Sequence, residues 1–550
     1  MAVVIIGFAA LYLAGNGQVS LWDRDEAWYC QTSKQMVASG DWVIPHFLNK
    51  PRTAKPILIY WLQAASMSVF GPTEFAARFV SAAATTAVLI VLAITLTRSV
   101  GPALAAWTIL IFASSGLVIA TAKMCLIDSA MLLLITGMQI CVYRLWQNKG
   151  AIATVIALWV LAGLAVLAKG PAPLVIVFTS MLLLAIFHVG RQWRSPAAWG
   201  GAVAWWRTLR PLWGLLIIVI VAGPWAVMAL IRNPEFMKAL LWEPGRHLTQ
   251  NESGHLFIPG YFVATIWLTY FPWSLFLPAA LVAGFRNRAQ PHVRYALAII
   301  LGNWIFSELM ATKLPHYMLP SYASLAFLTA TALQPYMQDP MHRDLRTIAY
   351  KIGVAIWGIG GLVLACLPFL AIFWFRNFDP RQAATFTVMG AIYVGVVCRL
   401  LYRRQITRAA GAMAAGMLLL IAHLFLLYFP RAAFLRLPER AGTLLSRIQD
   451  NQPIFMVGYD EPSFAYYQGG TILAKDDNYL AKTDPQNWPT WIVTTGKVYD
   501  RLPPDRKAAL VIVHRLRGMN YNTSQTVTEL LIARKRLASA SQPTTRKIEP

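Results

Sequence analysis

Long apolar runs separated by short polar joints dominate the first 430 residues of the chain. Many of these runs are about 17–25 residues long, the length that a helix needs to cross the hydrocarbon core of a bilayer. The pattern therefore predicts about thirteen membrane-spanning helices. They are expected at 2–14, 75–97, 102–120, 124–143, 151–168, 171–188, 212–231, 261–284, 292–310, 316–335, 350–375, 383–402 and 410–429.

The remaining segment, 431–550, is mixed and polar, and it predicts a separate C-terminal domain. Its short apolar runs are separated by Asp, Asn, Pro and Gly, which indicates strands joined by turns. These runs lie at 453–458, 471–474, 490–495 and 509–514. A helical-looking segment at 527–536 completes the prediction of a small α/β domain.

The overall composition excludes a soluble globular protein. The 550 residues are 57% hydrophobic and 13% charged, with a mean hydropathy of +0.51. The net charge of +24 favours contact with anionic membrane lipids over nucleic-acid binding, because no zinc-finger spacing or base-stacking motif accompanies it. The five cysteines show neither a disulfide framework nor a metal-ligand spacing.

Basic residues gather in alternate loops, which predicts that these loops are cytoplasmic. They are Arg98, Arg144, Lys149, Arg191, Arg194, Arg207, Arg210, Arg286, Arg288, Arg294, Arg343, Arg346, Lys351, Arg399, Arg403, Arg404 and Arg408. The other loops also contain acids. The first loop (15–74), the later loop (231–260), the joint near Lys313 and the C-terminal domain are therefore expected on the opposite, periplasmic side.

The first of these loops is the richest in candidate chemistry. Asp25 and Glu26 could act as a general base or bind a metal ion, or they could simply cap the helix expected over 26–39, since acids favour helix N-termini. Gly40 should end that helix, and a second surface helix is expected after Pro56.

Two further charged residues lie at the ends of apolar runs on the same predicted side. Asp128 opens a span, and an acid beside hydrocarbon indicates a functional site; the alternatives are an ion pair with Lys123 or a capping role. Lys55 precedes an apolar helix and could meet a lipid phosphate, or it could snorkel to the membrane surface.

Two polar joints complete the candidates. Lys313, His316 and Tyr317 lie in a Pro-bounded joint, and could line the site or form an ordinary interfacial belt. Arg246 could bind a phosphate through two parallel hydrogen bonds. A divalent metal site is a further alternative in the same loop, although its spacing is not diagnostic, with ligands Glu243, His247, Glu252 and His255.

The residues 25–29 (Asp-Glu-Ala-Trp-Tyr), Lys55-Pro56, Asp128 and the joint Lys313–Pro320 together resemble the GT-C superfamily. These are integral-membrane glycosyltransferases that use polyprenyl-phosphate-linked sugars. Within it, the chain resembles the bacterial aminoarabinose transferase family, whose members move 4-amino-4-deoxy-L-arabinose from undecaprenyl phosphate to lipid A phosphates. At residues 55–57 this chain has Lys-Pro-Ile, whereas Lys-Pro-Pro is commoner in the family.

The resemblance implies a fold and a set of roles. It implies an all-α polytopic GT-C fold in the inner membrane, and a periplasmic C-terminal domain. Asp25, with Glu26, would orient the acceptor phosphate or steady positive charge on the sugar, and Asp128 would assist. Lys55 and Arg246 would hold the carrier phosphate. Tyr29 and Tyr317 would line the cavity beside Lys313 and His316.

The resemblance further implies membrane-lipid partners, no nucleic acid and resistance to polymyxins and other cationic peptides. No cofactor is certain, and a divalent metal remains open. Three alternatives remain: transfer of another sugar, such as mannose, to a protein or glycan; lipid transport; and a structural membrane role. No inverted repeat supports transport.

Overall fold

The computed structural model describes residues 1–22, 25–48, 50–190, 194, 196–249, 259–339, 341–373, 380–448, 453–459, 461–520 and 528–535. The chain divides into two compact units. The first unit comprises Met1–Val19, Thr32–Ala371 and Asp379–Pro430, and the second comprises Ser20–Gln31, Ile372–Phe378 and Arg431–Pro550.

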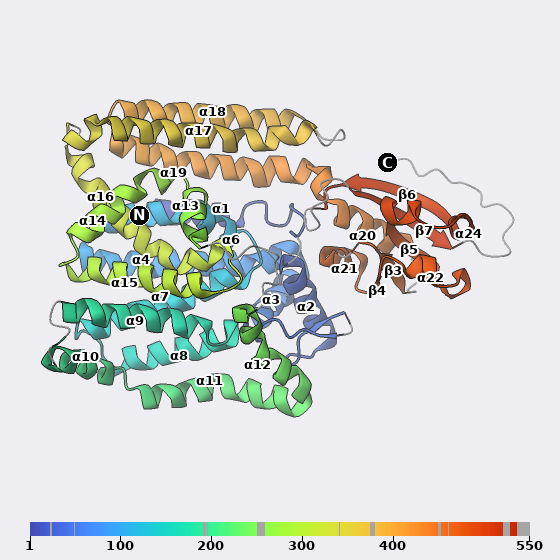
Figure 1. Ribbon diagram of the computed structural model, residues 1–550, viewed down its shortest axis with the longest axis horizontal. Coiled ribbons are helices and arrows are strands. Elements are labelled where there is room, and N and C mark those ends of the chain that lie inside the picture. The colour runs from blue at the N-terminus through green and yellow to red at the C-terminus, as the bar shows by residue number, and fades with distance from the viewer. Residues whose placement is uncertain are drawn as a thin grey trace. The chain divides into compact units, whose positions relative to one another are not determined.

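The first unit is a bundle of helices (Figure 1). Its N-terminal half contains α1 (Ala2–Leu13), α3 (Leu58–Phe70), α4 (Glu74–Val100), α5 (Pro102–Ala113), α6 (Gly116–Ala122), α7 (Ile127–Trp146), α8 (Ile152–Lys169) and α9 (Ala172–Val189). Its later half contains α10 (Pro196–Thr208), α11 (Pro211–Arg232), α12 (Pro234–Thr249), α13 (Tyr261–Thr269), α14 (Leu277–Arg286), α15 (Pro291–Leu309), α16 (Tyr322–Gln338), α17 (Ile348–Leu370), α18 (Pro380–Tyr402) and α19 (Ile406–His423).

All the apolar segments predicted to span the membrane contain helix, and the chain is a multi-span membrane protein. Within the described residues, eight helices are long and apolar enough to cross a bilayer, and a ninth span appears if the bent pair α5–α6 counts as one. The predicted count of about thirteen spans is therefore not confirmed.

Two of the predicted spans are interrupted rather than continuous. α5 and α6 meet at an angle of 65°, where Ser114 and Ser115 donate hydrogen bonds back to the carbonyls of Leu110 and Ile111. Serines that bond back to carbonyls compete with the helix ladder and bend it. The segment predicted at 261–284 breaks between α13 and α14 around Pro272, a residue that cannot donate a backbone hydrogen bond.

Helix α7 lies inside the bundle, packed against α4 and α8, while α8 also packs against α11 and α9 against α15 (Figure 1). Most residues of α7 are buried, including Ile127, Met131 and Ile135. The bundle also buries two cations near α1, Arg78 and Lys123. Lys123 donates to the carbonyls of Leu11 and Ala14, so it stabilises the C-terminal end of that helix.

The second unit contains a five-stranded sheet of order β4-β3-β5-β7-β6. β3 runs parallel to β4 and β5, whereas β7 is antiparallel to β5 and β6. The strands are β3 (Ile454–Val457), β4 (Ile472–Lys475), β5 (Trp491–Thr495), β6 (Leu510–Gly518) and β7 (Thr528–Lys535). The helices with them are α20 (Leu437–Ile448), α21 (Pro462–Gln468), α22 (Tyr479–Lys482), α23 (Gly496–Asp500) and α24 (Pro504–Ala508).

The predicted small α/β domain is confirmed, with one correction. The segment predicted as helical at 527–536 is strand β7. It pairs with a strand on each side, and Leu530 to Ala533 are all fully buried. A short apolar run buried on both faces has no period that separates strand from helix, which explains the wrong prediction.

Candidate active site

The Asp128 carboxylate lies in the first turn of α7 and is almost completely buried. Its Oδ1 accepts a hydrogen bond from Nζ of Lys169 at 2.9 Å, and its Oδ2 lies 3.8 Å from Nε2 of His316. The helix N-cap is Leu126, without a side-chain hydrogen bond, so Asp128 does not cap the helix. Its predicted alternative partner, Lys123, bonds to the carbonyls at the end of α1 instead.

Lys169 is the last residue of α8, and Gly170 follows with a positive φ of 63°. Because α7 and α8 are consecutive neighbours joined by a short connection, they run antiparallel. The end of α8 therefore meets the start of α7. The Lys169 ammonium also lies 5.4 Å from the centre of the Tyr317 ring, within range of a cation–π contact.

Lys55 belongs to the same cluster. It precedes α3, which begins at Leu58 after Pro56 as predicted, and its positive charge acts on the Asp128 carboxylate. α3 also supports the turn before Asp128, because the buried Gln63 side chain donates to the Cys125 carbonyl at 3.2 Å. Gln63 in turn accepts a bond from Ser33 at 3.0 Å.

His316 and Tyr317 lie in a 3-10 helix, η3 (Pro315–Ser321), with their rings in edge contact at 5.1 Å. The buried Asn303 side chain on α15 holds this segment. Its amide donates to the Tyr317 carbonyl at 3.1 Å and to the Ser321 hydroxyl at 3.0 Å. Two hydrogen bonds from a buried amide restrict where the His316 ring can lie.

Lys313 is fully buried and paired with Glu308. It donates to the Glu308 carbonyl, its ammonium lies 3.5 Å from the Glu308 carboxylate, and the Phe262 ring is 5.7 Å away. The Glu308 carboxylate also accepts from the Gly260 backbone at 2.6 Å. These contacts give Lys313 a structural role at the joint before η3.

Asp25, Glu26 and Tyr29 lie in helix α2 (Asp25–Ser39), which the sequence predicted and which Gly40 ends. This part of α2 belongs to the second unit. Asp25 is exposed, whereas Tyr29 is buried. Glu26 is buried and accepts a hydrogen bond from the Trp22 backbone at 2.7 Å, so its carboxylate helps to fix the segment that precedes the helix.

The segment that precedes α2 is held in place by other residues of the second unit. The backbone of Leu21 donates to the Tyr467 hydroxyl at 2.9 Å, and Ser20 donates to the Glu439 carboxylate. Burial raises the pKa of Glu439, but the hydrogen bonds from Arg436 and Ser20 outweigh it and hold the pKa below its usual value.

The structure describes part of the later loop, 231–260, for which a phosphate or metal site was predicted. Glu243 is in α12, as are Arg246 and His247, whose side chains are not described, and Glu252 and His255 lie outside the described residues. Within the described part of the chain, no group of three or more His, Cys, Asp and Glu side chains is placed to hold a metal ion.

Four of the predicted residues thus come together: Asp128, Lys55, His316 and Tyr317. Sequence reasoning missed Lys169. A signal for it existed, because a lysine ending the span after Asp128's span must lie at the same end of the bundle. The cluster places one carboxylate among two lysines and a histidine, an excess of positive charge that suits a phosphate.

Comparison with known proteins agrees with the fold. The family model for dolichyl-phosphate-mannose-protein mannosyltransferase matches residues 1–240. The crystal structure of ArnT from Cupriavidus metallidurans bound to undecaprenyl phosphate superposes with a TM-score of 0.77 at 20% identity, over 99% of each chain. The chain therefore has the GT-C fold.

Curated relatives share more sequence. An undecaprenyl phosphate-alpha-4-amino-4-deoxy-L-arabinose arabinosyl transferase of Aeromonas salmonicida is 31% identical over 376 residues, which is 66% of this chain and 64% of that protein. The enzyme of the same name from Serratia proteamaculans is 28% identical over 368 residues, 66% of this chain and 63% of the relative. The chain thus spans somewhat less than two thirds of the length of these relatives.

Proposed function

We propose that this protein transfers 4-amino-4-deoxy-L-arabinose from undecaprenyl phosphate to phosphate groups of lipid A. The observation that supports the proposal most is the buried Asp128 carboxylate, bound by Lys169 at 2.9 Å, with His316 and Lys55 around it. The names of the curated relatives supply the sugar and the carrier.

The charge balance of the cluster fits the donor. A sugar linked to a polyprenyl phosphate is a phosphodiester with one negative charge, and its departure leaves a phosphomonoester on which further negative charge develops. Cations placed where that charge appears stabilise the transition state more than the ground state. Lys55 and Lys169 supply them, while Asp128 holds the Lys169 ammonium in place.

The transfer itself requires little acid–base chemistry. An oxygen of the acceptor phosphate attacks the anomeric carbon, the bond from that carbon to the carrier phosphate breaks, and its electron pair stays on the carrier. An acceptor phosphate is already ionised, so no strong base is needed. Asp25, exposed at the start of α2, is then proposed to orient the acceptor, and Arg246 to assist Lys55.

The distribution of basic residues supports a periplasmic site in the inner membrane. Asp128 lies in the first turn of α7 and Arg144 in its last turn. Because Arg144 belongs to the basic loops expected in the cytoplasm, Asp128 would face the periplasm. Lys55 and Lys169 would then meet undecaprenyl phosphate and lipid A on one side of the membrane.

The proposal is tested in cells that lack their own aminoarabinose transferase but make the donor lipid. Expression of this chain should add the amino sugar to lipid A, as measured by mass spectrometry, and should raise polymyxin resistance. Asp25→Asn and Lys55→Gln should abolish the addition, whereas the exposed-lysine control Lys351→Gln should not. Unmodified lipid A in cells containing folded, membrane-inserted wild-type protein would refute the proposed substrate pair.

A second candidate is transfer of mannose or another hexose to a protein or glycan, which the mannosyltransferase family match favours. Purified protein supplied with undecaprenyl-phosphate aminoarabinose or undecaprenyl-phosphate mannose separates the two. Consumption of the mannosyl donor alone would favour this candidate.

A further inference from the structure

A pocket of about 300 Å³ lies at the end of the bundle opposite to Asp128. α7 runs from Ile127 to Trp146, and Trp146 lines the pocket, so a 20-residue helix separates the two sites. At a rise of about 1.5 Å per residue, that helix is roughly 30 Å long, the thickness of a bilayer core. The other lining residues are Asn148, Ala185, His188, Gly201, Ala204, Trp205 and Thr208.

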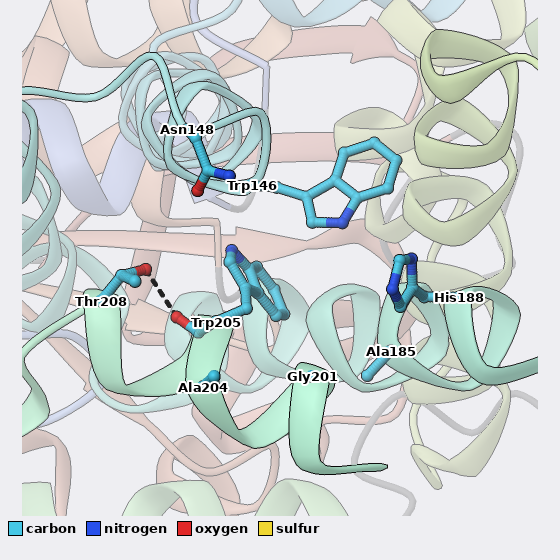
Figure 2. Close-up of a pocket in the computed structure, with 8 residues that line it drawn as sticks. All are labelled: Trp146, Asn148, Ala185, His188, Gly201, Ala204, Trp205 and Thr208. Carbon is cyan, nitrogen blue, oxygen red and sulfur yellow. Dashed lines mark hydrogen bonds between the residues drawn. The ribbon is translucent and has the colours of Figure 1, made fainter. Parts of the chain in front are cut away.

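Aromatic rings with nitrogen donors surround this space. Figure 2 shows the indoles of Trp146 and Trp205 and the imidazole of His188 around the same opening. The Nε1 atom of Trp205 is buried and has no hydrogen-bond partner among the described residues. A buried N–H group without a partner is costly, so a ligand whose acceptor reaches Nε1 would stabilise it.

The walls of the pocket are held in place by aromatic packing. Trp146 stacks on Tyr295 with ring centres 6.3 Å apart, and Trp205 contacts Trp206 edge-on at 6.0 Å. The Thr208 hydroxyl is already used, because it donates to the Trp205 carbonyl at 2.6 Å (Figure 2). Ring packing therefore restricts the positions of these two indoles.

The segments that form this end of the bundle contain cations and no carboxylates. No Asp or Glu occurs between Asp128 and Glu235. The cations of these segments that the structure describes are Arg144, Lys149, Arg194, Arg207 and Arg210. An excess of positive charge beside a buried N–H donor favours an anion that only accepts hydrogen bonds, such as a phosphate.

Apolar surface continues from the pocket along the neighbouring helices. Trp199 and Val203 on α10 are 38% and 51% exposed, and Leu212 and Trp213 on α11 are 81% and 64% exposed. A soluble anion would leave these side chains in water, whereas acyl chains would cover them. We propose that this pocket binds the phosphate headgroup of an anionic membrane phospholipid, with its acyl chains against α10 and α11.

Two adjacent glycines provide a matched test. A Cβ at Gly200 or at Gly201 would meet no heavy atom within 4 Å, so either position tolerates a side chain, but only Gly201 lines the pocket. Gly201→Leu should fill the pocket, and Gly200→Leu should gain the same helix propensity without filling it. Trp205→Phe removes the unpartnered donor and keeps the ring, with Trp206→Phe as its control.

The measurement is the affinity of full-length purified protein in neutral detergent for fluorescent phosphatidylglycerol, with fluorescent phosphatidylcholine for comparison. Phosphatidylglycerol should bind at least roughly tenfold more tightly, because several cations lie near the headgroup. Gly201→Leu should weaken its binding about tenfold or more, since the side chain excludes the headgroup. Trp205→Phe should weaken it about two- to tenfold, as expected for one hydrogen bond.

Three results would overturn the proposal. The first is equal affinity for the two lipids, and the second is equal binding by the Gly200→Leu and Gly201→Leu proteins. The third is displacement of the lipid by millimolar inorganic phosphate, which would assign the pocket to a soluble anion. Because neither the donor nor lipid A enters this assay, its outcome is independent of the proposed transferase activity.

Discussion

The two ends of α7 differ in whether the charged groups around them have an internal partner of opposite charge. At the Ile127 end, the buried Asp128 carboxylate is bound by Lys169, with His316 3.8 Å away. At the Trp146 end, the neighbouring segments contain arginines and lysine but no carboxylate, and an indole N–H is buried without a partner. The first end has an internal counter-ion, whereas the second depends on an external anion.

This difference shows how the two ends of one helix can contribute to different sites on the two faces of a membrane. A carboxylate beside hydrocarbon is retained only when partners stabilise it, and such partners also fix its position. A fixed carboxylate among cations suits a reaction in which charge moves between phosphates. Exposed cations without a carboxylate suit reversible contact with lipid headgroups.

Of the variants that compare the two ends of α7, Asp128→Asn should have the largest effect. Asp128→Asn keeps the shape of the side chain but removes the charge that positions Lys169, so the rate of sugar transfer should fall roughly 100-fold or more. The initial rate with purified protein, donor and lipid A measures it, with Asp344→Asn as the matched control. A rate within threefold of wild type would show that the carboxylate end is not the reaction site.

The next effect is at Lys169. Lys169→Gln removes the ammonium that bonds Asp128 and faces Tyr317, and should lower the same rate by about 10- to 100-fold. Lys169→Arg keeps a positive charge and should lose less. The same assay applies, and Lys351→Gln serves as the control. Equal losses for Gln and Arg would mean that shape rather than charge matters at this position.

A smaller effect is expected at Asn303, which supports His316 from a distance. Asn303→Leu removes the bonds to the Tyr317 carbonyl and the Ser321 hydroxyl, so it should lower the free energy of unfolding by about 1–3 kcal/mol. The transfer rate should fall several-fold through kcat while KM for the donor changes little. Thermal unfolding and donor titration measure both, against Asn287→Leu, whose amide makes only a local helix bond. Unchanged kcat would leave Asn303 with a purely structural role.

The smallest effect concerns salt. The Debye length falls from about 10 Å at 0.1 M to about 3 Å at 1 M, so exposed charges are screened far more than buried ones. Raising the salt over that range should weaken phosphatidylglycerol binding several-fold and change the sugar transfer rate less than twofold, because the Asp128 side chain is only 5% exposed. The opposite order of sensitivity would reverse the assignment of the two ends.

Much of the fold could be predicted from the sequence because hydrocarbon imposes a simple rule. Apolar runs of sufficient length must form helices, and these appear at each predicted segment. The breaks at Ser114–Ser115 and near Pro272 come from serine hydrogen bonds to nearby carbonyls and from a proline, which the hydrophobic periodicity does not reveal. Strand β7 was missed because its neighbours on both sides decide its conformation.

The candidate site was predicted less evenly. Asp128, Lys55, His316 and Tyr317 could be found because charge or polarity at the end of an apolar run is costly unless it is used. Lys169 was missed, although the antiparallel arrangement of consecutive helices places it beside Asp128. The pairing of Lys313 with Glu308 and the backbone contact of Glu26 arise from partners that no spacing rule identifies.

The most direct measurement is photocrosslinking with an undecaprenyl phosphate that carries a reactive group next to its phosphate, followed by peptide mapping. If the Asp128 end holds the carrier phosphate, the label should fall on peptides containing Lys55, Lys169 or His316, and excess unlabelled undecaprenyl phosphate should suppress it. Labelling confined to peptides containing Trp146, His188 or Trp205 would contradict the account.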